Sequence, residues 1–169
     1  VAAAGASIGV VSQPEYFRVI AVTEAGATIK TTLGGSLATV TLKTRGSYAD
    51  LASTREFLLE SDAPVMLQSV SASQDDGGVP RGLPGGDPSS IILPPVEQFR
   101  RSYVFLTPDK YNFDFVRIIA SPSAAVVLDG KPVQEIAACA MVPGDGLDAE
   151  ARGSPLPPYV VYRCQLSFP

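Results

Sequence analysis

The chain has 169 residues, 46% hydrophobic and 18% charged, a composition that can bury a core and is not that of a disordered tail. Its 13 basic and 17 acidic residues give a net charge of -4, which provides no electrostatic footprint for a nucleic-acid backbone. Histidine is absent, which excludes Ser-His-Asp and Cys-His catalysis and histidine-ligated metals. Because 15 glycines and 15 prolines leave little room for long helices, we expect an all-β, β-sandwich-like fold.

Alternation of apolar and polar residues predicts the first strands. Residues 17–22 and 27–32 alternate on either side of the turn Glu24-Ala25-Gly26, which predicts a hairpin. The pair Gly34-Gly35 predicts the next turn, and residues 37–43, rich in threonine and valine, predict the strand that follows.

Two interpretations remain for residues 47–63, a stretch without glycine or proline. Asp50 could cap a helix that has Leu51, Arg55, Leu58 and Leu59 at helical spacing. Alternatively, residues 55–59 form a strand, 61–63 a turn and 64–71 a second strand. We favour the strands, because a proline directly after an Asp-Ala pair suits a turn that opens a strand.

A long loop, rich in glycine and proline, is expected over residues 73–95. Such loops often carry function, so its charged residues form a candidate binding loop: Asp75, Asp76, Arg81 and Asp87. Oxygen ligands on flexible backbone also suit Ca²⁺, which makes Asp75, Asp76 and Asp87 a weak calcium candidate. Their spacing matches neither an EF-hand nor a nonapeptide repeat, and a solvated acidic loop is the alternative. No other cofactor or metal is expected.

Strand patterns resume after this loop. Residues 98–106 predict one strand, residues 113–120 and 124–128 predict a further pair, and Asp129-Gly130 predicts a hairpin turn. Residues 136–142 and 159–164 are apolar and strand-like, and a second acidic loop over residues 143–158 separates them.

Each of the last two strands contains a cysteine. Cys139 and Cys164 could form a disulfide if these strands are neighbours, because the bond needs Cα atoms within about 7 Å. Two buried free thiols are the alternative. We favour the disulfide, since other features suggest a secreted protein.

An internal repeat suggests two related β units. The residues after Arg18 match those after Arg117, because both stretches have the order Arg, two apolar residues and Ala, and each match is followed by a short turn and a β-rich segment. The expected units are residues 1–95 and residues 96–169. The second lacks counterparts of strands in the first, so we expect it to be incomplete at its C-terminal end. An incomplete unit leaves a free sheet edge, which we expect beside residues 159–166.

Motifs for catalysis are weak. Gly5-Ala6-Ser7-Ile8-Gly9 has the letters of a nucleophile elbow, but no histidine could serve as its base. Carboxylates that could form a catalytic pair show no signature spacing: Glu56, Glu60, Asp109, Asp114 and Asp129. The dense aromatic set is expected to be core, with a sugar- or peptide-binding face as the alternative: Phe99, Tyr103, Phe105, Tyr111, Phe113 and Phe115.

Residues 57–130 carry four motifs in the order found in a known family. They are Asp62-Ala63-Pro64-Val65 followed by Gln68, then Gly86-Asp87-Pro88, then Pro94-Pro95 followed by Glu97-Gln98-Phe99, and finally Tyr103 and Phe105 followed by Thr107-Pro108. This stretch resembles the IgGFc-binding domain family. The resemblance implies a secreted or surface-displayed β-rich module without catalytic residues. The family pattern continues past the last residue of this chain, in agreement with an incomplete second unit.

The sequence therefore favours an extracellular or cell-surface module that is not an enzyme and that acts through protein partners, adhesion or self-association. No nucleic-acid partner is expected, and no stretch of this chain is long and apolar enough to span a membrane. The alternative is a secreted glycan-binding accessory domain or a glycoside hydrolase that uses the aromatic face.

Overall fold

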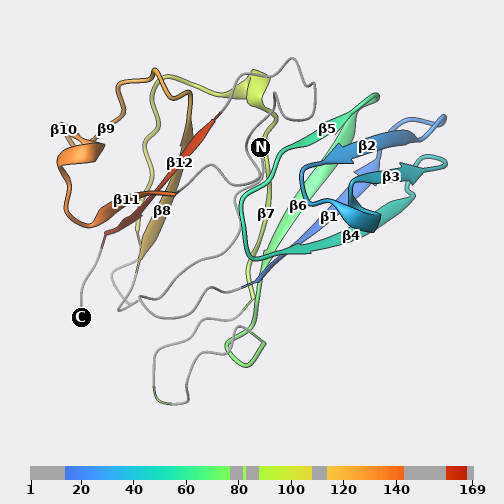
Figure 1. The fold of residues 1–169 in the computed structure, drawn as a ribbon, viewed down its shortest axis with the longest axis horizontal. Helices are drawn as coiled ribbons and strands as arrows, with labels where there is room; N and C mark the ends of the chain where they lie inside the picture. Colours follow the sequence, from blue (N-terminus) through green and yellow to red (C-terminus); the bar gives the residue numbers. More distant parts are fainter. Residues whose placement is uncertain (1–13, 77–81, 83–87, 108–113, 143–158, 167–169) are drawn as a thin grey trace. The chain divides into compact units, whose positions relative to one another are not determined.

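The structure is a computed structural model that describes residues 14–76, 82, 88–107, 114–142 and 159–166. Within these residues the strands β1 to β12 pair antiparallel and the helices are single 3-10 turns, so the predicted all-β class is confirmed (Figure 1). The chain divides into two compact units, Val1–Phe99 and Arg100–Pro169.

The first unit contains a four-stranded sheet in the order β4-β1-β6-β7. Its strands are β4 (Tyr48–Ser53), β1 (Glu15–Ala21), β6 (Val65–Ser71) and β7 (Ser90–Ile92). In β1 every second residue, from Glu15 to Ala21, is buried, and the residues between them are exposed or half-buried. One face of the sheet therefore turns to the core and the other to solvent.

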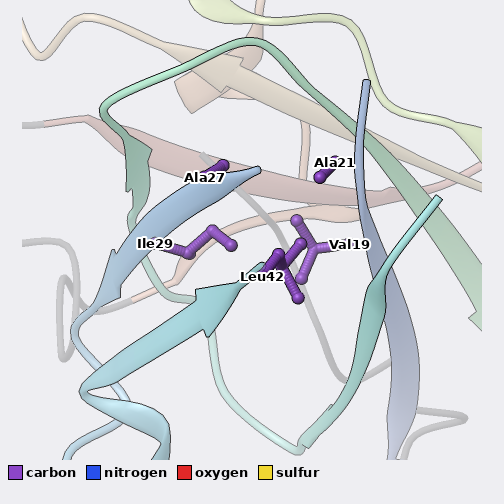
Figure 2. Packing of buried hydrophobic residues seen from close by; sticks show 5 residues of the cluster. All are labelled: Val19, Ala21, Ala27, Ile29 and Leu42. Carbon is purple, nitrogen blue, oxygen red and sulfur yellow. The ribbon is translucent and has the colours of Figure 1, made fainter. Parts of the chain in front are cut away.

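The second sheet of this unit has the order β3-β2-β5 and covers the inner face of the first. Its strands are β3 (Thr39–Leu42), β2 (Ala27–Thr31) and β5 (Leu59–Ser61), and the 3-10 turn η1 (Gly35–Leu37) precedes β3. Side chains from β1, β2 and β3 meet in one buried cluster (Figure 2): Val19, Ala21, Ala27, Ile29 and Leu42. A neighbouring buried cluster holds Phe17, Leu51 and Phe57. The first unit is thus a β-sandwich, as predicted.

The predicted hairpin between residues 17–22 and 27–32 is wrong, although both strands exist. β1 pairs with β4 and β6, whereas β2 pairs with β3 and β5. The turn closed by Gly26 N–H and Thr23 C=O carries the chain from one sheet to the other. The physical reason is that the buried residues of both strands fill the same core from opposite sides, which a flat hairpin does not allow.

The middle region contains strands and no helix, so the strand interpretation is confirmed, with shifted boundaries. β6 matches the predicted strand over residues 64–71. The predicted strand over residues 55–59 is wrong. The strands of this region are β4 and β5, and the buried residues Glu56, Phe57 and Leu58 lie between them in the chain. In β4 only Leu51 and Ser53 are buried, so its apolar signal is too weak to mark it.

The last part of the loop expected over residues 73–95 contains a strand. Its residues 90–92 form β7, which pairs with β6, and Ser71 and Ser89 hydrogen-bond at the start of this pairing. The 3-10 turn η2 (Val96–Gln98) follows.

The second unit contains a three-stranded sheet in the order β11-β12-β8. Its strands are β11 (Cys139–Val142), β12 (Val160–Gln165) and β8 (Phe115–Ala120), and Val133, Tyr162 and Cys164 form its buried cluster. A small hairpin joins β9 (Val127–Leu128) to β10 (Lys131–Pro132), followed by the 3-10 turn η3 (Val133–Glu135). Asp129 and Gly130 have φ angles of 49° and 80°, so the predicted turn is confirmed, because such angles match a two-residue hairpin.

Three predictions for this unit are wrong. β8 pairs with β12, so residues 113–120 and 124–128 are not partners. Residues 99–107 contain no strand, and those from Tyr103 to Leu106 are exposed. β12 lies in the middle of its sheet, so no free edge exists along it, and the edge strands are β11 and β8. The sequence marks β8, β11 and β12 correctly but does not specify which strands pair.

Candidate functional site

The outer face of the sheet β4-β1-β6-β7 gathers large and charged side chains from strands that are distant in sequence. The register aligns three rows across this face. Tyr48, Ile20 and Met66 form one row, Asp50, Arg18, Gln68 and Ile92 the next, and Ala52, Tyr16, Val70 and Ser90 the third. Tyr16, Tyr48, Met66 and Ile92 are exposed. We call these rows the outer face.

Arg18 lies at the centre of the outer face and is held from two directions. Its Nε and one terminal nitrogen donate to the two carboxylate oxygens of Asp50 at 2.7 and 2.8 Å, a bidentate pair. Its guanidinium also lies 4.3 Å from the centre of the Tyr48 ring. The hydrogen bond from Arg18 lowers the pKa of Asp50, and the same bond raises the pKa of Arg18.

This cluster orders side chains more than it stabilises the fold. Both partners of the ion pair are about half exposed, and ion pairs that solvent reaches contribute little to stability. The contact of the Arg18 guanidinium with the exposed Tyr48 ring also adds little, because solvent weakens cation–π attraction. What the cluster provides is a fixed orientation for Arg18 and Tyr48 while leaving both accessible to a partner.

The described part of the candidate binding loop is hydrogen-bonded to the outer face. Residues 74–76 form a turn, and the Asp76 carboxylate accepts a short hydrogen bond from the Tyr16 hydroxyl, which raises the pKa of Tyr16. Asp75 is exposed beside it. Arg81 and Asp87 lie outside the described residues, so a binding site that contains all four predicted residues stays a prediction.

No calcium site is visible in the described part of the chain, where no three acidic or cysteine residues are grouped as metal ligands. Because Asp87 lies outside it, the calcium candidate stays a prediction. The serine motif at residues 5–9 and Asp109 also lie outside the described residues. Of the other candidate carboxylates, Glu56 and Glu60 belong to the first unit, and Asp114 and Asp129 to the second.

The aromatic set is not the core that the sequence favours. Tyr103, Phe105 and Phe115 are exposed and Phe99 is half-buried, while Tyr111 and Phe113 lie outside the described residues. The aromatic pair that does form core is Phe17 and Phe57, whose rings meet edge to face with centroids 5.0 Å apart.

The disulfide between Cys139 and Cys164 is confirmed. The two residues are direct cross-strand partners in β11 and β12, with Cα atoms 3.9 Å apart. Because Gln165 N–H donates to Ala138 C=O at 2.9 Å, the neighbouring cysteine pair is a non-hydrogen-bonded one, in which side chains approach most closely.

An open depression elsewhere in the first unit is a poorer candidate. The Arg55 guanidinium there is engaged by the carbonyls of Thr32 and Leu33, at 3.0 and 3.4 Å, so it fastens the chain instead of facing a ligand. The lining residues are Pro14, Leu33, Leu37, Ala52, Ser53, Thr54 and Arg55.

Sequence reasoning missed the outer face. The alternation of β1 marks Tyr16 and Arg18 as outward-facing, but Tyr48 and Asp50 lie on β4, which the sequence did not mark, and only the register brings them to Arg18.

Comparisons with known proteins show the family of this chain. In the described part of the chain no helix is long and apolar enough to cross a membrane. Neither the curated proteins nor the solved structures contain a match to the chain. A family model described as IgGFc binding protein matches residues 4–148 and agrees with the resemblance seen in the sequence. This family is one of binding-type domains and is not known for enzymes. The chain belongs to the IgGFc-binding family.

Proposed function

We propose that the chain is an extracellular or cell-surface module that binds a protein partner through the outer face of the sheet β4-β1-β6-β7. Membership of a family of binding-type domains supports a binding role over catalysis. The disulfide supports an oxidising compartment, because such bonds persist mainly in secreted and surface proteins.

The observation that carries the proposal is Arg18, held by Asp50 and by the Tyr48 ring on an exposed sheet. Tyrosine, arginine and methionine are enriched where proteins bind one another. Tyr48, with 57% of its surface exposed, and Met66 lie in the row next to Arg18. Side chains already fixed in position lose little conformational entropy on binding, which favours affinity.

The partner is a protein and the use is adhesion or structural association. A sheet face that spreads its exposed side chains over four strands fits a protein surface better than a small molecule, which prefers a concave site. Glycan binding is the second candidate, and exposed Tyr103 and Phe105 in the second unit favour it. The family gives no support to glycoside hydrolysis.

Surface plasmon resonance with the immobilised chain tests the proposal, and the IgG Fc fragment is the probe that the family name supplies. We expect the double variant Tyr48→Ala, Arg18→Ala to weaken binding at least about tenfold, because hot-spot tyrosine and arginine side chains contribute about 2 kcal/mol or more. The matched control is Thr41→Ala, an exposed position on β3 of the opposite sheet. It should leave binding unchanged.

Two results would count against the proposal. Equal binding of Fc by the double variant and the wild type would exclude the outer face. Binding of an arrayed oligosaccharide that Tyr103→Ala abolishes, with no protein bound, would favour the glycan candidate instead.

A further inference from the structure

The strand β4 forms one edge of the sheet β4-β1-β6-β7 and, within the described residues, pairs only with β1. Ala21 N–H donates to Ser47 C=O at 2.9 Å, and hydrogen-bonded pairs alternate along an antiparallel ladder. Ala49 and Leu51 therefore bond to β1, whereas the residues on either side of them direct their backbone N–H and C=O groups away from it. These outward residues are all exposed: Tyr48, Asp50 and Ala52. Such groups form a template for one more strand.

The side chains of β4 define what an added strand should carry on the outer side of the sheet. Asp50 is the middle one of the three outward residues, and 57% of its side chain is exposed. Its carboxylate accepts two hydrogen bonds from Arg18, and a carboxylate has about four acceptor sites, so it can accept from a further donor. A basic residue opposite Asp50 is therefore favoured, and an acidic residue there is repelled.

The inner side of the same edge offers an apolar depression. Ser53 is buried on the inner side of β4, and the cross-strand partner of a residue points to the same side of the sheet. An open depression of about 340 Å³ lies at this end of β4, lined in part by Ser53, Leu33 and Leu37. Both leucines also pack against the buried cluster around Phe17. An apolar side chain from an added strand would cover these leucines.

A second copy of this chain fits the edge less well than a different protein. Two β4 strands paired antiparallel about Asp50 would set the two Asp50 carboxylates opposite each other, and like charges directly opposite destabilise a pair. A shifted register separates these charges but pairs fewer of the outward residues. Charge complementarity therefore favours a partner segment that carries a basic residue.

We propose that the partner adds an extended segment antiparallel to β4, with a basic residue opposite Asp50 on the outer side and an apolar residue over Leu33 and Leu37 on the inner side. Backbone hydrogen bonds give affinity in this mode of binding, and alternate side chains give specificity. The inference rests on the proposed function, because β4 also contributes Tyr48 and Asp50 to the outer face.

Fluorescence anisotropy of a labelled peptide, titrated with the full chain, tests the proposal. The probe is a short synthetic peptide in which valine alternates with threonine and lysine replaces the central threonine, so that one side is apolar and the other carries the lysine. We expect this peptide to bind. The same peptide with glutamate in place of lysine should bind at least about tenfold more weakly, because the glutamate would lie opposite Asp50.

Methylated peptides test the backbone pairing without changing the protein. The residue opposite Asp50 forms a hydrogen-bonded pair with it, so the N–H of the peptide lysine faces β4. Methylation of that nitrogen should abolish binding. Methylation of a neighbouring valine nitrogen, which points away from β4, should leave the affinity nearly unchanged.

A pair of proline variants tests the edge on the protein. Ala52→Pro removes an outward N–H and leaves the hydrogen bonds from β4 to β1 in place, as edge strands tolerate. The matched control is Thr41→Pro on β3. Because Thr31 N–H donates to Ala38 C=O at 3.0 Å, Thr41 likewise directs its N–H away from its partner strand. We expect only Ala52→Pro to weaken peptide binding, by at least about tenfold, with circular dichroism as the check that both variants fold.

Three results would overturn the proposal: no binding of the lysine peptide by the wild type, equal binding by Ala52→Pro and the wild type, or loss of binding in Thr41→Pro alone. A wild-type dimer in sedimentation equilibrium that Ala52→Pro abolishes would make a second copy the occupant instead. The proposed function fails separately. Binding of Fc that depends on Tyr48 and Arg18, without binding of the peptide, would support the outer face and exclude only the edge.

Discussion

At the scale of single residues, register decides which side chains can cooperate. Arg18 alone is an exposed cation on a strand, and Asp50 alone is an exposed carboxylate 32 positions away. Pairing of β1 with β4 sets them opposite each other, one row from Tyr48. The result is an ordered polar centre on a face that also exposes tyrosine and methionine side chains. Function, on the proposal above, follows from this order and not from the small stability that the pair contributes.

The Arg18–Asp50 pair makes a prediction about pH. The pKa of Asp50 is lowered in the folded chain by the hydrogen bond from Arg18, so the stabilisation is present above the ordinary aspartate pKa of 3.8 and is lost as pH falls through the lower folded value. We expect Asp50→Asn to lower the free energy of unfolding slightly at neutral pH and to match the wild type in strong acid. Urea denaturation at a series of pH values measures this difference.

Repeating that series in an Arg18→Gln background provides the control, because the cycle isolates the pair. The effect of Asp50→Asn should vanish there at all pH values. An unchanged effect without Arg18 would mean that Asp50 stabilises the fold through another contact.

At the scale of elements, the sequence predicts the positions of the strands better than it predicts their pairing. β1, β2, β3, β6 and β8 were predictable from alternation, and Asp129-Gly130 from turn chemistry. β4 was missed because alanine and aspartate dilute its apolar pattern. Residues 103–106 have the composition of a strand but form none in the described part of the chain, and composition alone cannot reveal whether a partner strand is present.

The candidate site shows the same limit. The disulfide was predictable, because both cysteines lie in strand-like runs that turned out to be neighbours. The outer face was not, because it depends on β1 being the centre of a sheet instead of half of a hairpin. Turn residues in the sequence indicate that the chain reverses direction. Whether the next strand joins the same sheet depends on packing in the core.

The crossing from β1 to β2 depends on Gly26, whose φ of 77° lies in the left-handed region. A Cβ placed there would be 1.9 Å from the Leu42 carbonyl oxygen of β3. We expect Gly26→Ala to lower the free energy of unfolding by well over the roughly 1 to 2 kcal/mol of left-handed strain alone, because the clash adds to it. Thermal unfolding followed by circular dichroism measures the loss.

Gly46→Ala is the matched control for this clash. Gly46 has a φ of 80°, and a Cβ there would have nothing within 4 Å, so that variant should show the strain of the backbone without the clash. Equal destabilisation by the two variants would mean that the backbone of β3 moves aside at little cost and that the turn from β1 to β2 is not tightly packed against it.

At the scale of the whole molecule, the two units have separate sources of stability. The buried clusters around Phe17 and Ile29 belong to the first unit, and the cluster of Val133, Tyr162 and Cys164 belongs to the second. The second unit is small and holds the disulfide, as small extracellular domains with limited cores often do.

This division predicts that reduction acts on one unit only. A disulfide closing a loop of this size stabilises by about 2 to 4 kcal/mol, mainly by restricting the unfolded chain. Scanning calorimetry of the full chain should show two transitions, and reductant should lower the midpoint of one of them by roughly 10 °C or more, given about 4 to 8 °C per kcal/mol for units of this size. The double variant Cys139→Ala, Cys164→Ala should reproduce that shift without reductant. The transition that does not move should be the one that Gly26→Ala lowers, since Gly26 lies in the first unit. A single transition that both treatments shift as a whole would show instead that the two units unfold as one cooperative structure.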